Sequence, residues 1–86
     1  MSPEQALHES RWLPAGMKTS IEKLASLGYA LIPTNPDLPE VIAAIEEGAK
    51  ATASASDWAQ YSEEYRNRVR TDARAAFVAI IKELTK

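Results

Sequence analysis

The carboxyl-terminal stretch 62–84 constrains the fold most, because it is the longest segment with a clean helical period. Its apolar residues recur at spacings of three and four, which predicts one stripe along a helix of 3.6 residues per turn. Ser62 is a favourable N-cap, and Glu63 and Glu64 put negative charge in the first turn, where the helix dipole favours it. We therefore expect one helix against which the earlier segments pack. Its stripe consists of Tyr65, Val69, Ala73, Ala76, Phe77, Ile80 and Leu84.

Size and composition favour a single all-α domain spanning residues 1–86. Alanine is abundant, and β-branched and aromatic residues are sparse. The absence of cysteine excludes a disulfide framework and cysteine-ligated zinc, and it fits a reducing cytoplasm. No apolar run approaches the roughly 18 residues of a membrane span, and the amino terminus lacks the basic and apolar regions of a signal peptide. We expect a cytoplasmic protein that is neither secreted nor inserted in a membrane.

Two shorter helices are expected to complete a three-helix bundle over residues 17–86. Thr19-Ser20-Ile21-Glu22 is a capping-box signature that predicts a helix over 20–27, closed by Gly28. Asp37 and Glu40 form another capping box, which predicts a helix over 38–52. Within this second helix, Gly48 points to close packing of a neighbouring helix, since glycine otherwise costs about 1 kcal/mol against alanine.

The junction before the last helix allows two structures. In the first, Asp57 caps a single turn at 57–60 and the helix restarts at Ser62, so that Trp58 and Tyr61 lie against its start. In the second, one long helix runs from Asp57 to Leu84. We favour the single turn and a final helix over 62–84.

Residues 1–16 are expected to form an N-terminal helical arm. Ser2-Pro3 is a helix start, and the segment Leu13-Pro14-Ala15-Gly16 is expected to stop that helix. Between the first two bundle helices, 29–32 is expected to be a buried extended connector; pairing of this segment with a second copy would instead give a homodimer. A loop over 33–39, stiffened by three prolines, follows it.

Arg66, Arg70 and Arg74 lie four residues apart beside the apolar stripe. Guanidinium groups bind carboxylates and phosphates through a planar, bidentate fork, so this row is a candidate contact for a partner. The alternative is a solvated flank whose long stems cover the edge of the core. Nucleic acid is the least favoured partner, because the net charge is −2 and phosphate binding needs several unopposed cations.

Tyr61 and Tyr65 adjoin this row and extend the candidate patch. In so small a domain, tyrosine and tryptophan are most simply core residues. Exposed Tyr and Arg, however, dominate the energetics of protein interfaces. The predicted partner-binding set is therefore Tyr61, Tyr65, Arg66, Arg70 and Arg74.

The sequence does not favour an enzyme, a cofactor or a metal site. His8 is the single histidine, whereas metal sites usually need three or four convergent ligands. No nucleophile elbow or glycine-rich phosphate loop is present. A helix-turn-helix is also disfavoured, because a long proline-rich connector replaces the short turn and the second helix is acidic.

From Tyr29 onward the chain resembles a loose group of short proteins encoded by bacteriophages and prophages, most of which have no assigned function. The resembling pieces are the segment Tyr29-Ala30-Leu31-Ile32-Pro33-Thr34, the helix ending in Glu47-Gly48-Ala49, and residues 73–81. The chain departs from the pattern by the extra Asp37-Leu38-Pro39, and no functional residues can be transferred. The resemblance implies a phage accessory protein that binds a host or phage protein inside a bacterium. Small inhibitors of bacterial immunity, such as anti-CRISPR proteins, are the specific expectation.

Overall fold

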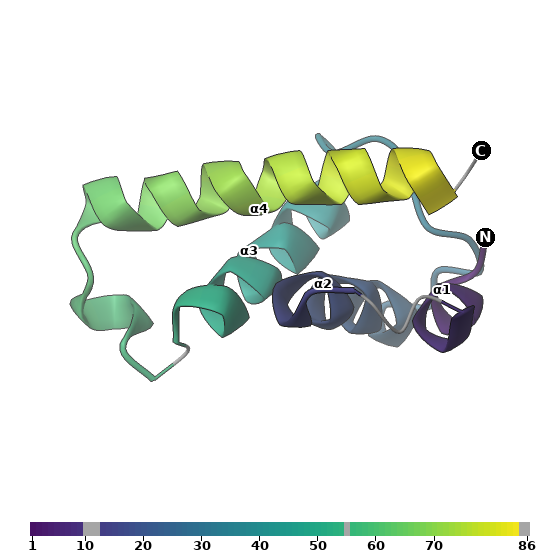
Figure 1. Ribbon diagram of the computed structural model, residues 1–86, viewed down its shortest axis with the longest axis horizontal. Helices are drawn as coiled ribbons and strands as arrows, with labels where there is room; N and C mark the ends of the chain where they lie inside the picture. The colour runs from purple at the N-terminus through teal and green to yellow at the C-terminus, as the bar shows by residue number, and fades with distance from the viewer. Residues whose placement is uncertain (10–12, 55, 85–86) are drawn as a thin grey trace.

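The computed structural model describes residues 1–9, 13–54 and 56–84, and over these ranges the protein is all-α (Figure 1). The helices α2, α3 and α4 form a three-helix bundle, and the short helix α1 packs against α2 as an N-terminal arm. The fold class expected from the sequence is therefore confirmed. The elements in chain order are α1 (Pro3–Glu9), α2 (Ala15–Ser26), α3 (Pro39–Ala53), the single 3-10 turn η1 (Trp58–Gln60) and α4 (Glu63–Leu84).

Most of the helix boundaries agree with the sequence pattern. Helices α3 and α4 begin and end within one residue of the predicted ranges, and η1 lies at the predicted turn. The backbone N–H of Tyr65 donates to Ser62 Oγ at 3.2 Å, so Ser62 is the N-cap of α4. The backbone N–H of Gln5 donates to Ser2 Oγ at 3.1 Å in the same way at α1.

The predicted start of α2 at residue 20 is wrong. The helix begins at Ala15, directly after Pro14, and Gly16 lies inside its first turn instead of stopping the arm. Thr19, the expected N-cap, lies inside the helix, where its hydroxyl donates to the carbonyl of Ala15 at 3.1 Å. Its neighbour Ser20 is only 3% exposed, and the single hydroxyl proton of Ser20 is shared between the carbonyl oxygens of Gly16 at 3.2 Å and of Ala44 on α3 at 2.8 Å. The segment that resembled a capping box is therefore interior to α2, and its Ser20 is a buried link between two helices.

The predicted capping box at α3 is also wrong. Leu38 occupies the N-cap position, and no side chain caps the helix. Proline is favoured at the first helical position, because its φ angle suits the helix and the N–H it lacks would have no partner within the helix. Asp37 instead pairs with Arg74 of α4, at 2.8 Å between Oδ1 and Nη2.

Helices α2 and α3 make the most extensive contact in the molecule, and their backbones touch where they cross. A Cβ added to Gly48 would lie 2.5 Å from the carbonyl oxygen of Gly16, and a Cβ added to Gly16 would lie 2.7 Å from that of Gly48. Only residues without a side chain allow this approach. Small residues therefore recur every fourth position at the crossing: Gly16 and Ser20 on α2, and Ala44, Gly48 and Thr52 on α3.

The hydrophobic core receives side chains from all four helices and from the connector. In the connector, Ile32 is buried and its backbone N–H donates to the carbonyl of Met1 at 2.9 Å, whereas Leu31 is 64% exposed. The connector is thus buried only at its end. The core consists of Ala6, Leu13, Met17, Ile21, Leu24, Ile32, Val41, Ala44, Ile45, Phe77 and Ile81.

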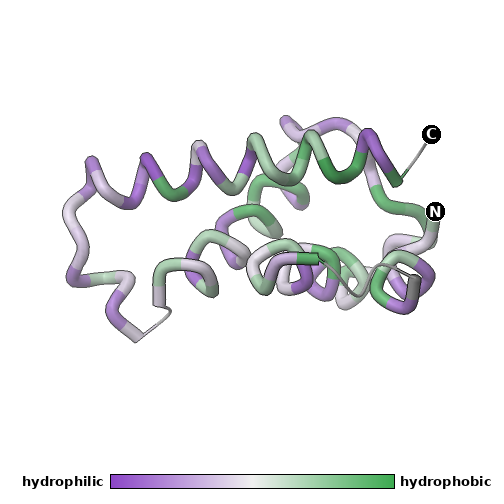
Figure 2. Tube along the Cα trace, viewed as in Figure 1, coloured by the Kyte–Doolittle hydropathy of each residue, from purple (hydrophilic) through white to green (hydrophobic). Residues whose placement is uncertain are grey.

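Helix α4 packs with only part of its apolar stripe. Within the stripe Phe77 is buried, but Ala76 and Tyr65 are exposed, Tyr65 by 42%. Ile81, which lies beside the stripe, is also buried. The expectation that the whole stripe packs on the bundle is therefore wrong at Tyr65 and Ala76. Figure 2 shows that the hydrophobic residues of α4 gather in its carboxyl-terminal half, while the amino-terminal half is mostly hydrophilic. Helix α4 is therefore anchored in the core by its second half.

The close crossing reverses the usual effect of a glycine substitution. Helix propensity alone predicts that Gly48→Ala stabilises the protein by about 1 kcal/mol. Because the new methyl group would meet the backbone of Gly16, we expect a net destabilisation of about 2 kcal/mol, measured by urea or thermal unfolding. Ala43→Gly, at an exposed position of the same helix, should cost only about 1 kcal/mol and is the control. A Gly48→Ala variant more stable than the parent would refute the crossing.

Candidate functional site

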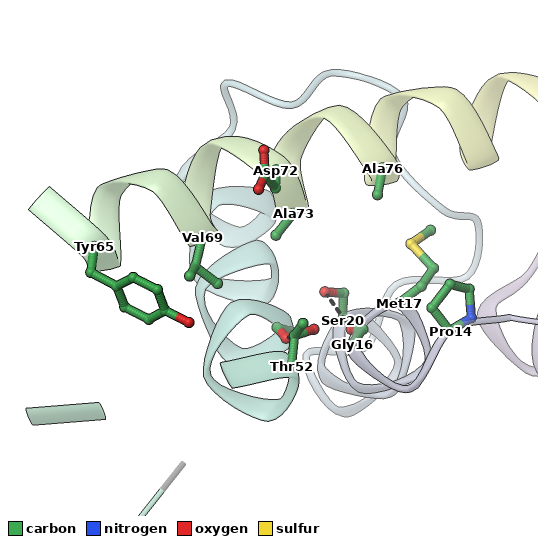
Figure 3. Close-up of a pocket in the computed structure, with 11 residues that line it drawn as sticks. Pro14, Gly16, Met17, Ser20, Thr52, Tyr65, Val69, Asp72, Ala73 and Ala76 are labelled. Carbon is green, nitrogen blue, oxygen red and sulfur yellow. Dashed lines mark hydrogen bonds between the residues drawn. The ribbon is translucent and has the colours of Figure 1, made fainter. Parts of the chain in front are cut away.

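A cavity of about 390 Å³ lies between the middle of α4 and the crossing of α2 with α3 (Figure 3). Its floor is formed by Gly16, Met17, Ser20 and Thr52, together with Pro14 and Gly48. Its roof is the side of α4 that carries Tyr65, Val69, Asp72, Ala73 and Ala76. We call this cavity the α4 groove.

The groove exists because small residues line both sides of it. On the floor, the close helix crossing leaves almost no side chain between the two backbones at Gly16 and Gly48. On the roof, the two alanines at 73 and 76 are too short to reach that floor. Close packing leaves few such voids inside a folded domain, so an apolar hollow of this size is a distinctive surface feature.

The groove contains few polar groups, and they differ in whether they have hydrogen-bond or ion-pair partners. The hydroxyls on the floor donate to helix carbonyls, Thr52 to Gly48 at 2.9 Å and Ser20 as described above. Asp72 is the one carboxylate that lines the groove, and it makes no ion pair with any residue that the structure describes. The groove is therefore apolar with one ionisable acid on α4.

Arg70 joins α4 to α3 through a bidentate ion pair. Its Nε and Nη2 lie 3.1 and 2.9 Å from the two carboxylate oxygens of Glu46, and Nη1 reaches Glu63 at 3.3 Å. The guanidinium carbon lies 5.4 Å from the ring centroid of Trp58, which is buried beneath it. The hydrogen bonds from Arg70 lower the pKa of Glu46 and, reciprocally, raise that of Arg70. We call Arg70, Glu46 and Trp58 the α3–α4 clamp.

The two neighbouring arginines also have partners within the chain. Arg66 pairs with Glu63 at 2.8 Å, while its Nε is buried without a hydrogen bond. Arg74 donates to Asp37 at 2.8 Å and to the carbonyl of Pro36 at 3.3 Å, which ties α4 to the proline-rich loop. The row of arginines thus faces α3 and the loop that precedes it.

The predicted partner-binding residues divide between two sides of α4. Tyr61 and Tyr65 meet edge to face with ring centroids 4.9 Å apart, and the Tyr61 hydroxyl donates to the carbonyl of Ala53 at 3.2 Å. Tyr65 faces the groove, whereas Arg66, Arg70 and Arg74 take part in ion pairs within the chain. Whether any of the five binds a partner stays a prediction. Tyr65 is the one of them that lines the α4 groove, while Arg70 and Arg74 line a smaller hollow of about 110 Å³ beside α3.

Sequence reasoning missed the floor of the groove. The signal was present as the spacing Gly16-xxx-Ser20 on one helix and Ala44-xxx-Gly48-xxx-Thr52 on the next. Two helices with small residues four apart can cross at backbone contact. Interpreting Gly16 as a helix stop concealed this pattern.

Residues 1–9, 13–54 and 56–84 contain no group of three or more His, Cys, Asp or Glu residues arranged to hold a metal ion. Within these ranges, none of the helices has the length and apolar character that crossing a membrane requires. Trp12 of the N-terminal arm, whose side chain is of the kind that anchors protein interfaces, lies outside the described residues.

Comparisons with protein-family models, with curated proteins and with solved structures found no match. Function is therefore argued from the geometry of the groove and the clamp.

The clamp and the exposed ion pair at Arg74 should differ in their contribution to stability. Arg70→Met removes the bidentate bonds and the contact with Trp58, and we expect it to lower the free energy of unfolding by about 1 kcal/mol. Arg74→Met should cost less than about 0.5 kcal/mol, because its partner Asp37 is 73% exposed. Urea unfolding of the two variants in parallel measures the difference. Equal losses would contradict the ranking.

The lowered pKa of Glu46 predicts an acid-sensitive contribution to stability. A carboxyl whose folded pKa lies below its ordinary value of 4.5 stabilises the fold above that value and loses this contribution as pH falls through the folded pKa. We therefore expect the drop in Tm between about pH 6 and pH 3 to be smaller in Glu46→Gln than in the parent. Glu22→Gln is the control, since Glu22 forms no ion pair among the described residues. An unchanged drop in Glu46→Gln would refute the clamp.

Proposed function

We propose that the protein is a non-enzymatic protein-binding module that acts inside a bacterium by occluding the surface of its partner. The observation that supports the proposal is the α4 groove. Along this groove part of the apolar stripe of α4 stays exposed, because the rest of the chain does not cover it. A hollow of about 390 Å³ with Tyr65 at one end falls within the roughly 300–1,000 Å³ of ordinary ligand pockets. Tyrosine at such a position is a frequent anchor in protein interfaces.

The chemistry of the groove supports binding over catalysis. The hydroxyls of Ser20 and Thr52 donate to helix carbonyls, so neither is paired with a general base. Asp72 is the one acidic residue of the lining, and no second carboxylate or histidine lies beside it in the groove to complete an acid–base pair. The residues present are those of a recognition surface.

The arginines support a protein partner over a nucleic acid. Each guanidinium of the row is opposed by a carboxylate: Arg66 by Glu63, Arg70 by Glu46 and Arg74 by Asp37. Affinity for phosphate backbones depends on cations that are free to replace counterions. A row of arginines whose charges are neutralised within the chain offers few such free cations.

The resemblance to short phage and prophage proteins supports a role as a phage accessory protein. In this proposal the partner is a component of bacterial immunity, such as a CRISPR effector. A small domain that shows no catalytic constellation over residues 1–9, 13–54 and 56–84 would act by covering the partner's working surface.

The proposal is tested by comparing two exposed positions of α4 in affinity capture from bacterial lysate. Tyr65 and Val78 are each 42% exposed, but only Tyr65 lines the groove. We expect Tyr65→Ala to weaken the Kd for the captured protein by about 30-fold or more, since loss of an interface anchor costs about 2 kcal/mol. Val78→Ala should leave the Kd within about twofold. Capture that is equal for the parent and Tyr65→Ala would contradict the proposal.

The narrower assignment to bacterial immunity has its own measurement. Expression of the protein in a strain whose CRISPR system targets a given phage should raise the plaque count of that phage by at least about tenfold, and Tyr65→Ala should abolish the increase. Unchanged plaque counts with effectors of every type tested would remove this assignment. The protein-binding proposal would then depend on the capture experiment alone.

A further inference from the structure

We propose that the α4 groove is the anchor site for a partner segment in which a large apolar or aromatic side chain is followed closely by a lysine or arginine. The apolar side chain would occupy the hollow, and the cation would meet Asp72 on α4. The inference rests on the proposed function and specifies the chemistry of the partner.

The size of the groove matches a bulky side chain. A cavity of roughly 150 Å³ inside a protein is large enough to hold benzene, and the groove has about 390 Å³. A ring together with its linking methylenes therefore fits without displacing the walls. Met17 on the floor and Val69 on the roof present apolar surface to such a ring, and a thioether makes favourable contacts with aromatic groups.

The walls of the groove cannot close to remove the hollow. The floor is set by backbone contact at Gly16 and Gly48, which leaves no room for the two lower helices to approach further. The roof is held in place by Phe77 and Ile81, which are buried in the core, and by the ion pair of Arg70 with Glu46. Bound side chains would therefore enter a preformed site, which lowers the cost of ordering on binding.

Charge complementarity determines whether the bound group should be positive or negative. Asp72 is the one acidic residue among those that line the groove, and no lysine or arginine is among them. The aromatic face of Tyr65 also attracts cations. Three of the four arginines of α4 are engaged on its other side with Glu46, Glu63 and Asp37, and the fourth, Arg68, does not line the groove. An apolar group with a positive charge therefore matches the groove, and one with a negative charge would be repelled.

Three small probes of nearly equal size test the assignment: 2-phenylethylamine, 2-phenylethanol and phenylacetate. Their binding to the full chain is measured by NMR titration of backbone amides and methyl groups. We expect millimolar affinity, as is usual for fragments of this size, with shifts centred on Met17, Val69 and Ala76. The amine should bind about threefold more tightly than the alcohol, and phenylacetate should bind most weakly.

Matched variants separate the groove from the rest of the surface. Asp72→Asn should reduce the affinity for the amine to that for the alcohol. Ala76→Leu fills the groove from its roof and should weaken all three probes at least about tenfold. Ala75→Leu adds the same side chain at the next, exposed position of α4 outside the lining and should change nothing. Thermal melting of each variant verifies that the fold is retained.

The outcomes distinguish this inference from the proposed function. Shifts spread over the whole surface, tightest binding by phenylacetate, or a preference for the amine that survives in Asp72→Asn would overturn the anchor site. In that event a Tyr65-dependent partner in the capture experiment would still support a protein-binding module. If the probes bind as expected but no captured protein depends on Tyr65, the groove takes a free amine, and the assignment to a partner segment is overturned.

Discussion

The backbone contact between α2 and α3 at Gly16 and Gly48 is the constraint on which the rest of the structure depends. Each glycine faces the carbonyl oxygen of the other, and Ser20 links the same two helices through the carbonyl of Ala44. A chain of 86 residues has a small core. A helix crossing this close buries backbone and apolar surface together with few residues. It also sets the position of the surface on which α4 lies.

Helix α4 is held at two places and spans the space between them. Its second half is anchored by Phe77 and Ile81 in the core, and its first half by the ion pair of Arg70 with Glu46 above Trp58. Between these anchors Ala73 and Ala76 of the roof are too short to reach a floor that is in backbone contact at Gly16 and Gly48. The groove is thus a consequence of how the three helices are joined. The proposed function follows from the same geometry, because the uncovered part of the apolar stripe is the part that faces the groove.

Local features of the fold could be predicted from the sequence. The bounds of α3 and α4, the turn η1 and the cap at Ser62 follow from periodicity and capping chemistry. The start of α2 was not predicted, because Thr19-Ser20-Ile21-Glu22 has a capping-box pattern although it lies inside the helix, where Thr19 donates to Ala15 and Ser20 contacts a distant helix. Propensity rules describe local competition and have no information on such tertiary contacts.

The candidate site was predictable only in part, for the same reason. The sequence pattern marked Tyr65 and the three arginines, but it could not show which side of α4 would face the bundle. The orientation of α4 about its own axis places Arg70 over Glu46, which lies 24 residues earlier in the chain. The same orientation leaves Tyr65 and Ala76 exposed. The partners Glu46 and Asp37 are too distant in sequence for helical spacing to reveal them.

The most direct test of the account is the distance between α2 and α3 at their crossing in solution. A nuclear Overhauser effect between the Hα protons of Gly16 and Gly48 measures it without any substitution. We expect a clear cross-peak, because each glycine lies against the carbonyl oxygen of the other. Absence of that cross-peak in a folded sample, with both glycine signals assigned, would contradict the crossing and with it the groove.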